Sequence, residues 1–121
     1  VLASARDAIQ ISWADPKNSQ QVLGDVVWSN TEQKGFMRFR GLPANDPNRE
    51  TYQLWIVDKS QKHPVDGGVF DVTPQTGEVV IPIDAKLQIK EPTQFVVTAE
   101  KPGGVVVSDL GKVSAVAKIQ T

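Results

Sequence analysis

The chain has 121 residues, enough for one domain with one hydrophobic core and too few for a second core of similar size. It has no cysteine, which excludes disulfide scaffolds, cysteine-ligated zinc, iron–sulfur clusters and thiol catalysis. Thirteen Lys and Arg against fourteen Asp and Glu give a formal net charge of −1, so the basic face of a nucleic-acid binder is missing.

Short β-prone runs separated by turn residues dominate the first part of the chain. Seventeen valines favour strands over helices, because β-branching restricts χ1 in a helix. The first runs are residues 9–13, 25–29 and 36–40. In the third run we expect Met37 and Phe39 to face one way and Arg38 and Arg40 the other.

The strongest strand pattern covers residues 51–58. Both of its faces are largely apolar, so we expect a central strand that is covered on both sides. Further strands are predicted at residues 69–72, 79–83, 94–100, 105–108 and 114–120. Pro82 cannot donate a ladder hydrogen bond, which places its strand at an edge or at a bulge.

The spacing of these runs predicts the fold class. We expect an all-β domain, an antiparallel β-sandwich (Ig-like or similar) of about 7–9 short strands with at most one or two helical turns. Residues 4–9 and 85–89 are the places where such turns fit. The chain starts at Val1 without a methionine or a signal-peptide pattern, so we expect it to be a piece of a longer polypeptide.

The sequence predicts no metal site or other cofactor. His63 is the only histidine and lies in a polar loop, and Met37 is the only methionine, so a copper or zinc site lacks further ligands. The segment 45–50 offers oxygen atoms, but Pro47 and Arg49 interrupt the pattern of a calcium loop. We therefore expect His63 to be a solvated loop residue.

Carboxylates are numerous, and a glycosidase-like pair needs a cleft and one carboxyl group with a raised pKa. The candidates are Asp58, Asp66, Asp71 and Glu100. We expect these acids instead to cap turns or to pair with Arg38, Arg40 or Arg49 on the solvent face. With no nucleophile–base pair either, we predict no catalytic residue and a non-enzymatic domain.

Two further sets of residues allow a structural or a binding interpretation. The glycine pairs at 67–68 and 103–104 fit hairpin turns that need positive φ. Trp13, Trp28 and Trp55 could line a sugar or peptide site if they were exposed. We expect Trp55 in the core, and we place the other two tryptophans on more peripheral strands.

Four motifs together resemble a known family. They are Gly41-Leu42-Pro43, Tyr52-Gln53-Leu54-Trp55, Gly67-Gly68-Val69-Phe70 and Thr98-Ala99-Glu100-Lys101-Pro102-Gly103-Gly104. In this order and spacing they resemble the C-terminal domain of anti-sigma-K factors, over roughly residues 24–108. We interpret the motifs as structural, with the glycines in turns and with Tyr52, Leu54, Trp55 and Phe70 in the core.

The resemblance implies a single-pass protein of the bacterial inner membrane. Its cytoplasmic N-terminal part would bind an extracytoplasmic-function sigma factor, and a membrane helix would lead to this domain in the periplasm. Regulated cleavage by a site-specific membrane protease would release the sigma factor. Residues 1–23 would then be a juxtamembrane segment with a first strand packed on the domain, and residues 24–121 the family's β-sandwich.

Our hypothesis from the sequence is a regulatory domain that governs protease access near residues 1–6. Cleavage requires local opening, and termini open first. The alternative is a cell-surface β-sandwich that binds a carbohydrate or a protein, which an exposed Trp13 or Trp28 would favour. A small hydrolase is the least favoured interpretation.

Overall fold

The computed structural model describes residues 8–15, 18–40, 42, 44–46, 48–72, 78–105 and 113–119. These residues form antiparallel strands, and none of them belongs to a helix long and apolar enough to cross a membrane. The strands are β1 (Ile9–Asp15), β2 (Asn18–Ser29), β3 (Lys34–Phe39), β4 (Thr51–Asp58), β5 (Val65–Phe70), β6 (Val79–Pro82), β7 (Pro92–Glu100) and β8 (Val113–Lys118).

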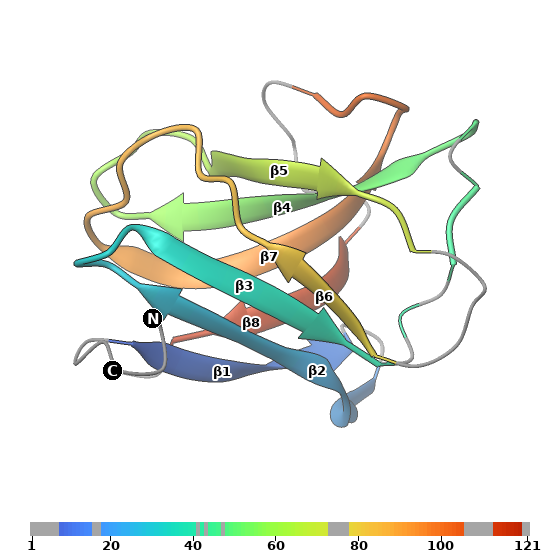
Figure 1. The fold of residues 1–121 in the computed structure, drawn as a ribbon, viewed down its shortest axis with the longest axis horizontal. Coiled ribbons are helices and arrows are strands. Elements are labelled where there is room, and N and C mark those ends of the chain that lie inside the picture. Colours follow the sequence, from blue (N-terminus) through green and yellow to red (C-terminus); the bar gives the residue numbers. More distant parts are fainter. Residues whose placement is uncertain are drawn as a thin grey trace.

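The eight strands form one sheet in the order β5-β4-β7-β8-β1-β2-β3-β6. Within the described residues β8 and β1 share one registered pair, Ala14 and Val116, so this junction divides the sheet into two halves. The half β5-β4-β7-β8 faces the half β1-β2-β3-β6 across a shared core, as Figure 1 shows. The predicted all-β class and strand number are confirmed, and the sandwich-like fold is nearly closed into a barrel.

The two edge strands, β5 and β6, come together through the chain that follows β6. The Asp84 N–H donates to the Gly67 carbonyl and the Lys86 N–H donates to the Asp66 carbonyl, each over 2.9 Å. Two main-chain hydrogen bonds therefore bridge the seam at one end of β5.

Proline explains why the seam is not closed further along β6. The Ile83 N–H donates to Gly35 of β3 over 2.9 Å, so the neighbouring residue Pro82 directs its main chain away from β3 and toward the seam. Pro82 has no N–H to continue the ladder toward β5. The predicted edge position of this proline is confirmed.

Aromatic rings hold the two halves together. Trp13 stacks on Phe39 with ring centroids 5.2 Å apart, Phe39 on Phe70 at 5.6 Å, and Phe70 on Tyr52 at 5.6 Å. This aromatic row runs from β1 and β3 to β5 and β4, so it crosses between the halves on the side where β5 and β6 separate. Such pairs contribute about 0.5–1.5 kcal/mol each beyond the area they bury.

Several details of the sequence prediction change. Trp13 and Trp28 are 0% and 1% exposed, so their strands are not peripheral. No helical turn forms at residues 85–89, because the Lys86 N–H bonds to β5 and the Ile89 N–H donates to Gln33 Oε1. The predicted turn at 4–9 and the predicted strand at 105–108 lie mostly outside the described residues. The predicted domain boundary at 23–24 falls within β2, and that division stays a prediction.

Candidate functional site

The family motifs meet on both faces of β4. The core face carries Tyr52 and Leu54, and the opposite face carries Gln53 and Trp55, as the alternation predicts. All four side chains are at most 6% exposed. The prediction of a central strand covered on both sides is confirmed.

Gln53 ties the outer face of β4 to the turn at residues 101–105. The Val105 N–H donates to Gln53 Oε1 over 2.9 Å, and Gln53 Nε2 donates to the Val105 carbonyl over 3.0 Å. The side-chain amide thus takes the place of a neighbouring peptide group. Because a buried amide without partners is costly, this contact fixes the position of the turn.

Gly104 allows the turn to come this close. Its φ is +79°, and a Cβ at this position would lie 2.6 Å from Val69 Cγ1 and 2.8 Å from Gln53 Oε1. Gly103 also has a positive φ of +86°, but a Cβ there would meet nothing within 4 Å. The predicted positive-φ turn at this glycine pair is confirmed, and Pro102 lies exposed in the same turn.

A second contact on this face joins β4 to β7. Trp55 Nε1 donates to Thr98 Oγ1 over 2.9 Å, and Thr98 Oγ1 donates to Glu100 Oε2 over 2.6 Å. Trp55 and Thr98 are both fully buried, although they lie outside the core between the two halves. Glu100 therefore accepts a structural hydrogen bond from the motif.

The other glycine pair differs from its predicted role. Gly67 and Gly68 lie inside β5 and not in a hairpin turn. A Cβ at Gly67 would come within 2.6 Å of Leu54 Cδ2, so close packing on β4 explains this glycine. Gly68 has φ +107°, and its N–H donates to Asp66 Oδ1 over 2.8 Å.

The remaining motif residues belong to the core or lie outside the description. Phe70 stacks on Tyr52 in the aromatic row, and Leu42 is buried. Burial, with a smaller effect of the Glu50 carboxylate, raises the pKa of Tyr52. Gly41 and Pro43 lie outside the described residues.

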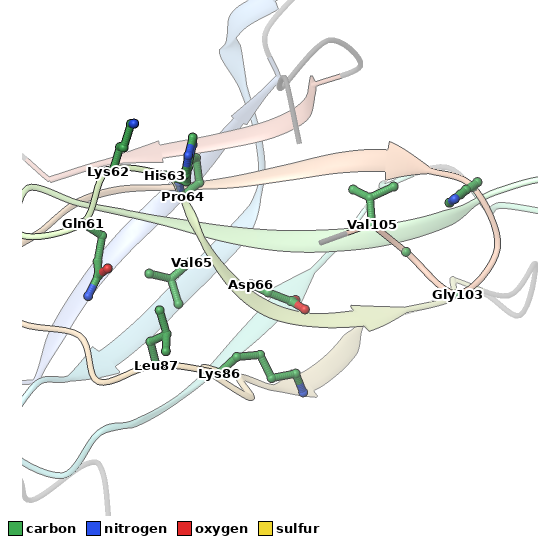
Figure 2. A pocket seen from close by; sticks show the side chains of 12 residues that line it. Gln61, Lys62, His63, Pro64, Val65, Asp66, Lys86, Leu87, Gly103 and Val105 are labelled. Carbon is green, nitrogen blue, oxygen red and sulfur yellow. The ribbon is translucent and has the colours of Figure 1, made fainter. Parts of the chain in front are cut away.

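A groove of about 620 Å³ adjoins the motif face. Its walls are the loop at residues 61–64, the start of β5, residues 86–87 and the turn at 101–105 (Figure 2). His63 lines the groove and is exposed, in agreement with a solvated loop position. The groove brings together segments that are far apart in the sequence, and no sequence motif indicated it.

The carboxylate candidates have separate structural partners. Asp58 is 2% exposed and accepts hydrogen bonds from Ser60 N, Ser60 Oγ, Lys90 N and Glu91 N over 2.8–3.0 Å. Burial alone would raise the pKa of Asp58, but these hydrogen bonds together outweigh it and hold the pKa below the usual 3.8. Asp71 accepts from Asn45 Nδ2 and Thr51 Oγ1. Because four donors keep the Asp58 carboxylate ionised, Asp58 holds the neighbouring loops in place and is a poor proton donor.

The arginines pair with other acids than the candidates. Their partners are Asp25 for Arg38, Glu78 for Arg40 and Asp46 for Arg49. The prediction of turn-capping acids therefore fits Asp58, whereas Asp66 accepts the Gly68 N–H within β5. The expected pairing of Asp58, Asp66 and Asp71 with these arginines was wrong. Within the described residues, no three His, Asp or Glu side chains gather as a metal site would require.

The three tryptophans offer no binding platform, because all of them are at most 1% exposed. Trp28 Nε1 donates to Asn30 Oδ1 over 2.8 Å, and Trp13 packs in the aromatic row. The exposed Trp13 or Trp28 that would favour a sugar-binding module is therefore missing.

The family model described as "Anti-sigma-K factor rskA, C-terminal" matches residues 1–109. No curated protein and no solved structure matches the chain. The matched range contains the four motifs, the groove-lining residues and strands β1 to β7.

Proposed function

Because the chain belongs to the family of anti-sigma-K factor C-terminal domains, we propose that its folded state controls the regulated proteolysis of a membrane-anchored anti-sigma factor. The family is regulatory and not catalytic, and its proteins act on sigma factors. In this proposal the domain lies in the periplasm. The sigma factor binds an N-terminal cytoplasmic segment, which a membrane helix joins to this domain.

The position of β1 is the observation that supports this mechanism. β1 follows directly on the N-terminal residues and pairs with β2 along its whole length, from Ile9 with Trp28 to Asp15 with Asn18. On its other side it shares only the pair Ala14–Val116 with β8 among the described residues. β1 is thus held firmly on one side and weakly on the other.

Trp13 couples the release of β1 to the stability of the core. Its side chain is fully buried at one end of the aromatic row, and removal of β1 would expose it. Truncation of a buried tryptophan costs about 3–5 kcal/mol. β1 therefore stays paired with β2 in the folded domain. A partner that loosens the core would shift the population toward a state in which a protease can reach the segment before β1.

Hydrogen exchange measured by mass spectrometry tests the mechanism on the 121-residue chain. We expect the amides of β1 to exchange before those of β4, and Trp13→Ala to accelerate exchange and proteolysis at β1 more than at β4. Phe95→Ala removes an equally buried ring from β7, the strand that pairs with β4, and is the control, which should not accelerate exchange at β1 more than at β4. If β1 is as protected as β4 in the wild-type chain, the gating mechanism is wrong.

A test of the proposed periplasmic location requires the full-length protein. Reporter fusions at Thr121 should show a periplasmic C-terminus, and the segment before the membrane helix should co-purify with a sigma factor. A cleavable signal peptide and no cytoplasmic segment would contradict the proposal.

A further inference from the structure

The groove beside the turn at residues 101–105 carries more positive than negative charge. Three lysines and one aspartate line it, although the whole chain has a formal charge of −1. Lys86 is paired with Asp84. Lys62 and Lys101 are exposed and have no ion-pair partner in the described part of the chain. Two cations are thus available to a ligand.

The groove also has an apolar part. Val65 is buried in the domain, and Leu87 is 53% exposed, so part of the leucine side chain faces solvent inside the groove. Figure 2 shows Lys62 toward one end of the groove and Gly103 toward the other, with Val65 and Asp66 between them. Lys101 belongs to the same turn as Gly103, because its carbonyl accepts the Gly104 N–H. The loop that carries Lys62 and the turn that carries Lys101 are therefore separated by the apolar Val65 and the acidic Asp66.

The wall made by the turn is rigid and has few side chains. Gln53 binds both main-chain groups of Val105, so the wall is held in place before any ligand arrives. Gly103 has no side chain and open space around it, so a ligand main chain can approach this part of the wall closely. A preformed wall lowers the ordering cost of binding.

We propose that this groove binds an extended acidic segment of a partner protein. An apolar side chain of the segment would pack on the exposed part of Leu87, and carboxylates on either side of it would lie near Lys62 and Lys101. The site does not depend on the proteolytic mechanism proposed above. It gives the domain a surface through which a partner of this chemistry can stabilise the folded state.

The arrangement of charge favours a peptide over other anions. A nucleic acid carries a continuous row of phosphates, and Asp66 between the two lysines would repel such a row. A lipid head group carries its charge in one place, whereas the two free cations belong to different walls of the groove, the loop at residues 61–64 and the turn at 101–105. A peptide can place an apolar residue between two acidic ones.

Fluorescence anisotropy on the 121-residue chain tests the proposal. The probe is a fluorescein-labelled peptide with glutamates on both sides of a central leucine. We expect saturable binding that weakens as salt rises, and a loss of about tenfold in affinity, or about 1.4 kcal/mol, for the double variant Lys62→Glu with Lys101→Glu. Leu87→Ser should also weaken binding, and a lysine-containing version of the peptide should not bind.

Matched variants serve as controls. Lys34→Glu with Lys118→Glu makes the same change of charge at exposed positions of β3 and β8, and Val80→Ser makes the same kind of change at a valine that is 56% exposed on β6. Both should keep wild-type affinity. The proposal is overturned if the peptide does not bind, if the controls weaken binding as much as the groove variants, or if phosphatidylglycerol vesicles or an oligonucleotide bind through the lysines and the peptide does not.

Discussion

The side chain of Gln53 forms both hydrogen bonds that a neighbouring strand would form with Val105. A polar residue in the middle of the most buried strand thus positions a turn that lies some fifty residues later. This turn, at residues 101–105, forms one wall of the groove. The family motif and the candidate binding surface are therefore parts of one arrangement.

Replacement of Gln53 by leucine tests the first part of this arrangement. Gln53→Leu leaves the Val105 groups without their partner, and we expect it to lower the free energy of unfolding by about 1–3 kcal/mol. Urea denaturation followed by circular dichroism measures the change. Gln94→Leu on β7, where the side chain is only partly buried, is the matched control and should cost less. Equal costs would show that the Gln53 contact contributes nothing specific.

The two glycines of the turn allow a comparison within one motif. Gly103→Ala and Gly104→Ala both force alanine to adopt a positive φ, at a cost of about 1–2 kcal/mol. Only Gly104→Ala also meets Val69 and Gln53, and such overpacking adds about 1–3 kcal/mol. We expect a clearly lower melting temperature for Gly104→Ala, and the close packing would be refuted by identical melting curves.

Asp58 makes the free energy of unfolding depend on pH in the acidic range. Its pKa lies below the unfolded value of 3.8, so its contribution is complete above about pH 4 and is lost as the pH falls toward the folded pKa. The pKa of Asp25 is also lowered, chiefly by its hydrogen bond with Arg38, and this aspartate contributes in the same pH range.

Asp58→Asn isolates the contribution of Asp58. The new amide group would face N–H donors, so we expect the free energy of unfolding to fall by about 1.5–3 kcal/mol at pH 7. Denaturation from pH 7 to pH 2 should show the gap between wild type and variant shrinking below about pH 4. Asp46→Asn, at an exposed carboxylate, should cost less at pH 7. A gap that stays constant with pH would contradict the assignment.

Two buried tryptophans differ in their hydrogen bonding. Trp55 Nε1 donates to Thr98, whereas Trp13 Nε1 has no hydrogen-bond partner within the described structure. Both substitutions by phenylalanine remove similar volume, but only Trp55→Phe breaks a hydrogen bond. We expect Trp55→Phe to cost at least about 1 kcal/mol more than Trp13→Phe. Chemical denaturation decides this, and the reverse order would rule out the role of the Trp55–Thr98 contact.

Several features of the fold could be predicted because they are local. The alternation of Met37 and Phe39 with Arg38 and Arg40 indicates which face of β3 is buried, and the structure has the same alternation. Pro82 lacks an N–H wherever it lies, so an edge position follows from its chemistry. Apolar residues on both faces of residues 51–58 similarly predict a covered central strand.

The pairing of distant segments could not be predicted in this way. Trp13 and Trp28 belong to short runs that look peripheral, yet the curling of the sheet places both in the core. Gly67 resembles a turn glycine, but its position in β5 is explained by the Leu54 side chain on the next strand. A local pattern contains no information on which strand lies beside which.

The sequence by itself thus determined the all-β class, the central and edge strands and the family. Only the tertiary structure decided that Gln53 holds the turn at 101–105 and that Asp58 accepts hydrogen bonds from the main chain at 90–91. It also decided that Lys62, Leu87 and Lys101 share one groove. The physical reason is the separation along the chain over which each kind of interaction acts. Hydrophobic periodicity and turn chemistry act between near neighbours, whereas a site forms where main-chain pairing brings together segments distant in the sequence.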